Sequence, residues 1–224
     1  MRRYSIRLSA MTIGAGVLAP SVCFAQSAAY ISQISEAQTQ RVQSRPADAV
    51  TNAPQGGATV SQTGNSAALA RVSQAGRANR ADVVQSGSTV AYADLAQTGD
   101  ANHALIGQFV GTNSAIVRQT GNDNVLLSVQ SASSATGSNY LSVSQTGDAN
   151  TASIGQDGDG NRLELSQTGS KTASIVQRGD SSVSLAQIGA GADSIALDMA
   201  PGMSMTVERY PGMVAPGVSV RTGK

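Results

Sequence analysis

The chain has 224 residues, enough for one ordinary domain with a tail. Aromatic residues make up only 3% of it, tryptophan is absent, charged residues make up 13% and glycine occurs 24 times, so a conventional core built on large aromatic side chains is excluded. A single histidine and a single cysteine exclude most catalytic and metal sites that depend on these residues.

The first 25 residues have the features of a secretory signal peptide. Three arginines among the first seven residues precede an apolar stretch at 8–18, and the tripeptide at 23–25 resembles a cleavage site, which places the cut between Ala25 and Gln26. The apolar stretch is too short to span a membrane. Processing as a lipoprotein at Cys23 is the alternative, but Val22 is bulky for the position before such a cysteine.

Removal of this segment changes both the redox chemistry and the charge. It removes the only cysteine, so an exported mature chain has no disulfide to stabilise it. It also removes three of the 15 Lys and Arg residues, which leaves 12 against 14 acidic residues and a net charge of −2. No basic patch is present, and we expect no nucleic-acid partner.

Residues 26–57 are predicted to be an N-terminal segment and linker. The stretch Ala29–Gln33 is compatible with one strand that ends in glutamine. From Pro46 to Gly57 the chain consists mainly of Ala, Asn, Pro, Gln and Gly without apolar periodicity, which is typical of a linker.

An internal repeat occupies the middle of the chain. It is clearest from Gln97 to Gln108 as QTGDANHALIGQ and from Gln145 to Gln156 as QTGDANTASIGQ, with weaker copies that begin at Gln74 and Gln108. Its glutamines recur at steps of 10 to 12 residues, with one step of 15, and such a period indicates a repeat fold. They are Gln62, Gln74, Gln85, Gln97, Gln108, Gln119, Gln130, Gln145, Gln156, Gln167, Gln177 and Gln187.

Apolar residues precede each glutamine with a period of two. The residue two positions before it is a branched aliphatic in eleven of the twelve copies, and the residue four positions before it is always apolar. This alternation predicts short strands with one buried face, separated by turns whose Gly, Asn and Asp residues accept positive φ. The predicted core residues are Val60, Val72, Val83, Leu95, Ile106, Val117, Val143, Ile154, Leu165, Ile175 and Leu185.

A strand of about five residues cannot bury a face alone, but two facing strands per turn can stack into a solenoid. We therefore predict an all-β, two-sheet β-solenoid of about six turns of about 22 residues, in residues 58–198. Within Ser128–Ser144, Ser128 interrupts the aliphatic column, no glycine follows Gln130, and four extra residues predict a bulged loop. Residues 199–224 are rich in Pro, Gly and Met, and we predict an irregular tail that is either a cap or a disordered end.

The Gln and Asn side chains share the inward parity of the aliphatic residues. Buried amides are costly unless they are hydrogen-bonded, but identical amides about 4.8 Å apart along a stack can bond to one another. We predict that the repeat glutamines, with Gln130 left out, form such a ladder and take part in self-assembly. Asparagines six residues before a glutamine could form a second ladder or only favour turns, and they are Asn79, Asn102, Asn113, Asn124, Asn139, Asn150 and Asn161.

Both ends of the array are predicted to be open. The first turn, near Val60, follows the linker, and the last, near Leu185, precedes the tail without a helix to cover it. Unpaired strand edges are templates for further strands, so we expect chains to stack end to end.

The repeat resembles the curlin repeat of curli, the amyloid fibres of Gram-negative bacteria, whose pattern is Q-x-G-x-G-N-x-A-x-x-x-Q. The resemblance covers about residues 58–187, more than half of the chain. The copy that begins at Gln156 keeps the second glycine of the pattern, although Leu163 replaces its alanine. In other copies alanine stands where the second glycine is expected, at Ala78, Ala101 and Ala149.

The resemblance implies a secreted structural subunit that crosses the outer membrane unfolded through a curli-type pore and polymerises at the cell surface as fimbrial biofilm matrix. It implies the chain itself and another curlin-type subunit as partners, and no enzyme activity, cofactor or small-molecule substrate. Charges spread through the array would slow assembly, namely Arg71, Arg80, Arg118, Lys171 and Arg178. A minor nucleating or anchoring subunit, or a non-polymerising surface adhesin, is the alternative.

Other functional classes fit the sequence less well. An enzyme would need clustered acid–base groups. His103 is instead predicted to be an exposed surface residue. Asp82 and Asp94 are predicted to share an outward column and to be solvated. The segment Asp157–Asn161 begins like a calcium loop but lacks the later Gly and Glu of that motif. An ice-binding face would need one residue type in a regular outward column, and the column before the glutamines is irregular.

Overall fold

The computed structural model describes residues 28–34, 48–50, 56–211 and 217–222, with side chains within 56–211. Every described element is a β-strand. The described ranges include no helix long and apolar enough to cross a membrane. The predicted signal peptide, with its cleavage site between Ala25 and Gln26, lies outside the described residues.

The strands form two sheets, sheet A with nine strands and sheet B with eight. In spatial order sheet A comprises β1 (Ala28–Ile34), β4 (Ala67–Ala75), β6 (Val90–Thr98), β8 (Thr112–Thr120), β10 (Ser138–Thr146), β12 (Asn161–Thr168), β14 (Ser182–Ile188), β16 (Met203–Arg209) and β17 (Gly217–Thr222). Sheet B comprises β2 (Asp48–Val50), β3 (Gly57–Thr63), β5 (Arg80–Ser86), β7 (His103–Phe109), β9 (Val125–Ser131), β11 (Thr151–Asp157), β13 (Lys171–Arg178) and β15 (Asp193–Met199).

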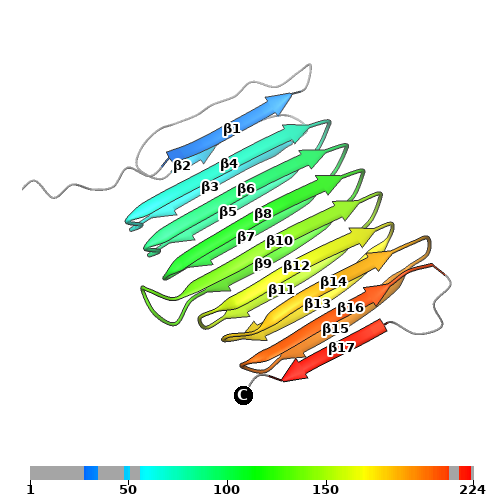
Figure 1. Cartoon of the computed structure of the whole chain (residues 1–224). Coiled ribbons are helices and arrows are strands. Elements are labelled where there is room, and N and C mark those ends of the chain that lie inside the picture. Colours follow the sequence, from blue (N-terminus) through cyan, green and yellow to red (C-terminus); the bar gives the residue numbers. More distant parts are fainter. Residues whose placement is uncertain (1–27, 35–47, 51–55, 212–216, 223–224) are drawn as a thin grey trace, which may run out of the picture.

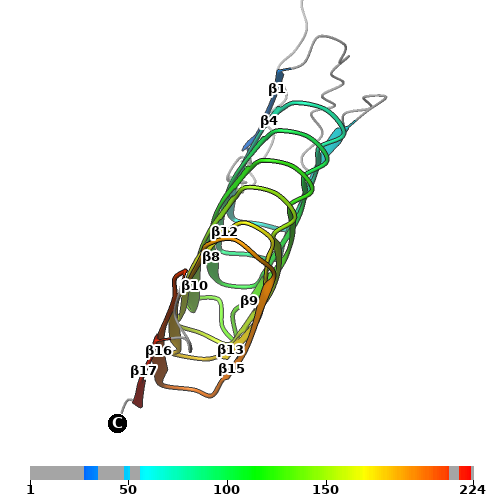
Figure 2. The same ribbon diagram turned by 90° about the vertical axis from the view of Figure 1, so that its right-hand side faces the viewer.

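Successive strands from β3 to β16 alternate between the sheets, so each pair of strands completes one turn of a flattened tube (Figures 1 and 2). All neighbours within this range are parallel and in register, so that repeat positions stack on one another, as in Gln85 opposite Gln108. The predicted all-β, two-sheet β-solenoid is therefore confirmed. It has seven turns rather than the expected six, because β15 and β16 add a turn after Gln187.

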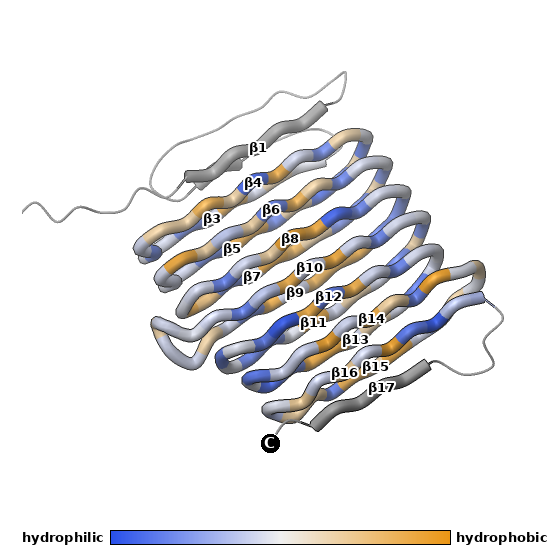
Figure 3. Tube along the Cα trace, viewed as in Figure 1, coloured by the Kyte–Doolittle hydropathy of each residue, from blue (hydrophilic) through white to orange (hydrophobic). Residues whose placement is uncertain are grey.

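The interior is a thin layer of Ala and branched aliphatic side chains between the sheets. Buried and outward residues alternate along the strands from β3 to β14, with the exception of Gly107 in β7, and the hydropathy of the chain alternates with them (Figure 3). Each residue predicted to lie in the core is at most 3% exposed. Burial of one such aliphatic side chain contributes about 1.5–3 kcal/mol, so the repeated columns provide the main apolar contribution to the fold.

Strands outside the predicted array extend both ends of the solenoid. The strand expected at Ala29–Gln33 is confirmed as β1, which pairs in parallel with β4 and places Gln33 opposite Gln74. Within the predicted linker, β2 pairs antiparallel with β3. The tail predicted to be irregular contains β16 and β17, since alternating Met203, Met205 and Val207 maintain a strand pattern after the glutamine motif has ended.

The predicted bulged loop is present between β9 and β10 and contains the extra residues (Figure 1). The strand before it remains in register, with Ser128 opposite Ile106 and Ile154. Ser128 is fully buried and its Oγ has no hydrogen-bond partner. A hydroxyl thus occupies an aliphatic position of the core.

Glycines stack at the turns from sheet A to sheet B. Gly99 and Gly121 have φ of 106° and 113°, and a Cβ on Gly99 would lie 2.2 Å from the carbonyl oxygen of Gly121. Two residues after the turn glycine, Ala78, Ala101 and Ala149 have φ of 55–58°, in the left-handed region that glycine enters without a Cβ penalty. The curlin pattern has its second glycine at these positions, so alanine strains the turn backbone.

We predict that Ser128→Val stabilises the fold by about 1–3 kcal/mol, because it removes an unpaired buried hydroxyl and adds apolar contacts between Ile106 and Ile154. Urea unfolding measures the change. The matched control is Ser153→Val on the exposed face of β11, for which we expect a change within about 0.5 kcal/mol. A loss of stability in Ser128→Val would show that the position has no room for a branched side chain.

Candidate functional site

Two columns of glutamine side chains run along the solenoid axis, one at the end of the strands of each sheet. In sheet A each Nε2 donates to the Oε1 of the glutamine one turn further on, at 2.6–3.1 Å, from Gln74 to Gln187. In sheet B the same bond recurs at 2.7–2.9 Å from Gln62 to Gln177. All twelve side chains are at most 5% exposed. Since every bond points the same way, the amide dipoles reinforce one another.

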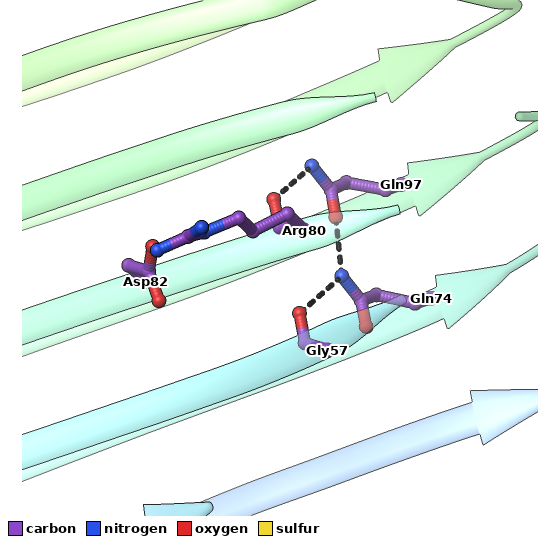
Figure 4. Close-up of polar contacts among 5 residues, drawn as sticks. All are labelled: Gly57, Gln74, Arg80, Asp82 and Gln97. Atoms are coloured by element: carbon purple, nitrogen blue, oxygen red, sulfur yellow. Dashed lines mark hydrogen bonds and ion pairs between the residues drawn. The ribbon is translucent and has the colours of Figure 1, made fainter. Parts of the chain in front are cut away.

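The second N–H of these amides joins the two sheets. Gln97 donates to the carbonyl oxygen of Arg80 at 3.0 Å, and Gln74 donates to that of Gly57 at 3.3 Å (Figure 4). Gln108 makes the corresponding bond from sheet B to Tyr92 in sheet A, at 2.9 Å. The carboxamide therefore bonds both along the axis and across the interior, and its burial is compensated only when neighbouring turns are in register.

Gln130 belongs to the sheet B column, although we left it out of the predicted ladder. It accepts from Gln108 at 2.9 Å and donates to Gln156 at 2.8 Å. The missing glycine and the long loop after it suggested a break in the column. Gln130 follows Gln119 by 11 residues, the usual step of the repeat, and this spacing was the signal that would have placed it in the ladder.

The asparagines form two further columns, one at each corner of the tube. At the corner from sheet A to sheet B, Asn102, Asn124 and Asn150 each donate Nδ2 to the Oδ1 of the preceding asparagine, at 2.9–3.1 Å. At the opposite corner, Asn139 and Asn161 continue the column from Asn113. Several of them also bond carbonyl groups of the turns, as Asn79 does to Ala75 and Gly99. These asparagines therefore pair along the axis and also bond the turns, so the alternative in which they only favour turns does not hold.

A column of Asp and Asn side chains at the turn surface was missed in the sequence. The Oδ1 of Asp100 accepts from the backbone N–H of Arg77, and that of Asn122 accepts from Asp100 N–H, at 2.7 and 2.9 Å. Asp148 serves Asn122 in the same way at 2.8 Å. These residues follow the turn glycine in the Q-x-G-D or Q-x-G-N pattern, and this position was the available signal.

The columns end at the C-terminal turn. Lys171 replaces asparagine, is buried, and donates its Nζ to the carbonyl of Gly191 at 2.7 Å. In the seventh turn Met199 lies opposite Gln177 and Arg209 opposite Gln187. Arg209 Nε lies 2.8 Å from Asp193 Oδ2 in an ion pair. This turn therefore offers no carboxamide that could continue either glutamine column.

The residues considered for catalysis and metal binding are dispersed. Asp82 lies in sheet B and Asp94 in sheet A, so they do not share a column as we expected, because successive strands alternate between sheets. His103 is half-buried rather than exposed, since Arg80 and Val125 flank it on adjacent strands.

The candidate calcium loop makes a different contact, since the Asp159 carboxylate accepts from Ser133 N–H at 2.8 Å. Within the described residues no three His, Cys, Asp or Glu side chains form a group that could hold a metal ion.

We predict that Gln145→Leu lowers stability by about 2–6 kcal/mol, because it leaves the Nε2 of Gln119 and the Oε1 of Gln167 buried without their partners. Ser144→Leu, on the exposed neighbouring position, is the control and should change stability by less than about 0.5 kcal/mol. Urea unfolding of both variants provides the comparison. Equal stability of the two would mean that the column does not hold the turns together.

Comparison with known families supports the same motif. Residues 91–121 and 138–169 match the family model of the curlin associated repeat. No curated protein and no solved structure matched the chain. The matched segments run through β6–β8 and β10–β12 and contain glutamines and asparagines of the columns described above. The chain therefore contains curlin associated repeats in these two segments.

Proposed function

We propose that the chain is a secreted structural subunit of curli-like amyloid fibres, which stacks end to end at the cell surface and contributes to adhesion and the biofilm matrix. The observation that carries this proposal is the pair of glutamine columns that run parallel to the solenoid axis. Adjacent turns within the chain associate through in-register parallel strands and one amide pair per sheet. A junction between chains can use the same strand pairing, since it requires no covalent connection. It cannot continue the amide pairs, because Met199 and Arg209 hold the glutamine positions of the last turn.

The surface charge is compatible with association of many copies. Three of the five cations that we expected to slow assembly form ion pairs, since Arg80 contacts Asp82, Arg118 contacts Asp94 and Arg178 contacts Asp198. Lys171 is buried and bonded to a backbone carbonyl. Paired charges repel a neighbouring copy less than isolated ones do.

The ends of the solenoid differ from the open edges that we expected. The turn that contains Val60 is covered by β1 and β2, and the turn that contains Leu185 is followed by the seventh turn. The edges available for stacking therefore belong to β1 and β2 at one end and to β15 and β17 at the other. The covered ends also favour the second candidate function, a minor nucleating or anchoring subunit or a non-polymerising adhesin.

The proposal includes partners and location. We infer export through the periplasm, passage through a curli-type outer-membrane pore, and assembly with further copies and another curlin-type subunit. We assign no catalytic residue, cofactor, nucleic acid or small-molecule substrate. We assign a role in self-assembly to the glutamine and asparagine columns, because they keep the turns of each copy in register for stacking.

The mature chain from Gln26 onward, purified in denaturant and diluted into buffer, should form fibres after a lag. X-ray diffraction from aligned fibres should give a spacing of about 4.7–4.8 Å along the fibre axis, and added fibre fragments should shorten the lag. A chain that stays monomeric for days, even when seeded, would contradict self-assembly and favour the adhesin.

A further inference from the structure

The two ends of the solenoid are closed to different extents. At the N-terminal end β1 and β2 add one strand to each sheet. At the C-terminal end β17 covers β16 in sheet A, but no described strand covers β15 in sheet B. Figure 1 shows β17 as the outermost strand at this end, beyond β16.

The core reflects this asymmetry. In the first turn, Ala58 and Val60 on β3 are at most 1% exposed. In the last turn the equivalent residues on β15, Ile195 and Leu197, are only partly buried. The unpaired backbone edge of β15 and these apolar side chains are features that proteins usually cover with a further strand.

The number of strands in each sheet indicates what can cover the edge of β15 and its apolar side chains. Sheet A has nine strands and sheet B eight, so a second copy that stacked on β17 would leave a gap one strand wide, about 4.8 Å, above β15. Without β17, sheet A would have eight strands, the same number as sheet B. The β1 and β2 strands of the next copy would then reach β16 and β15 together.

Strand direction supports the same exchange. The strands β1 and β16 each pair in parallel with their neighbours within the solenoid, whereas β17 pairs antiparallel with β16. If β1 of the next copy took the place of β17, sheet A would continue as an uninterrupted parallel sheet. In the register that β1 adopts on β4, its Gln33 would lie opposite Arg209.

We propose that β17 is a removable cap that blocks end-to-end stacking, and that β1 of a second copy replaces it on β16. This inference rests on the proposed function, and it adds an autoinhibitory strand and a polarity to it. The C-terminal end accepts and the N-terminal end docks. Since Met199 and Arg209 interrupt the glutamine columns at the junction, the exchange depends on backbone pairing and apolar contact rather than on amide bonds.

A reversible cross-link tests the cap. Thr206 on β16 lies opposite Ser219 on β17, so Thr206→Cys with Ser219→Cys allows β17 to be fixed by oxidation. The mature chain has no other cysteine if it begins at Gln26. We expect the oxidised variant to show at least a tenfold longer lag in seeded assembly, and the reduced form of the same sample to assemble like the unmodified chain.

Two further variants complete the test. Ser144→Cys with Ser166→Cys joins β10 to β12 on the exposed face of sheet A and controls for the effect of a cross-link away from the end. Ser219→Pro weakens the pairing of β17 and should shorten the lag several-fold.

The results distinguish failure of the β17 cap from failure of the proposed function as a fibre subunit. Equal lags for the oxidised and reduced forms, together with fibres from both, would overturn the cap but leave the fibre subunit in place. Absence of fibres from every variant, even Ser219→Pro with seeds, would overturn both.

Discussion

The structure depends on the pairing of buried carboxamides between successive turns. A glutamine in an apolar interior is costly unless its N–H and carbonyl groups are bonded, and in this chain the partner along the axis is the same residue one turn away. Gln119, for example, accepts from Gln97 and donates to Gln145, and its other N–H reaches the carbonyl of His103. A slip of one residue would separate these partners and move the aliphatic residues to the outer face. The hydrogen bonds between buried carboxamides therefore fix the register of neighbouring strands. Burial of the aliphatic side chains alone would specify this register less strictly.

This constraint explains features that are distant from the glutamines. Turn lengths can vary, because only the register of the strands must be kept, and the long loop between β9 and β10 leaves Gln119 and Gln145 bonded at 2.8 Å. Corners must be compact, which accounts for the stacked glycines at Gly99 and Gly121. The columns stop where Met199 and Arg209 occupy their positions, and the parallel arrangement of sheet A stops one strand later, at β17. The glutamine columns and the parallel strand pairing therefore both end in the last turn of the solenoid.

Much of this architecture could be predicted, because the repeat encodes a period and the period encodes which face is buried. The alternation before each glutamine was sufficient for the strands from β3 to β14, for their core residues and for the two-sheet solenoid, but not for β2, β16 and β17. It was harder to assign each residue to one of the two sheets. For that reason Asp82 and Asp94 were predicted to lie in one column, although they belong to opposite sheets. A cap or a disordered end could be named for the tail, but the strand β17 could not be predicted, since it carries no repeat motif and its antiparallel pairing with β16 depends on a neighbour that only the folded chain provides.

The mass per length of seeded fibres tests this account most directly. If intact solenoids stack end to end, with eight strand layers of about 4.8 Å each, scanning transmission electron microscopy should find one chain for every 38 Å or so of a single filament. A filament in which each chain lies flat in one layer would contain one chain for every 4.8 Å or so and would be about eight times heavier per unit length. A value near the first supports the solenoid as the fibre unit, and a value near the second contradicts it.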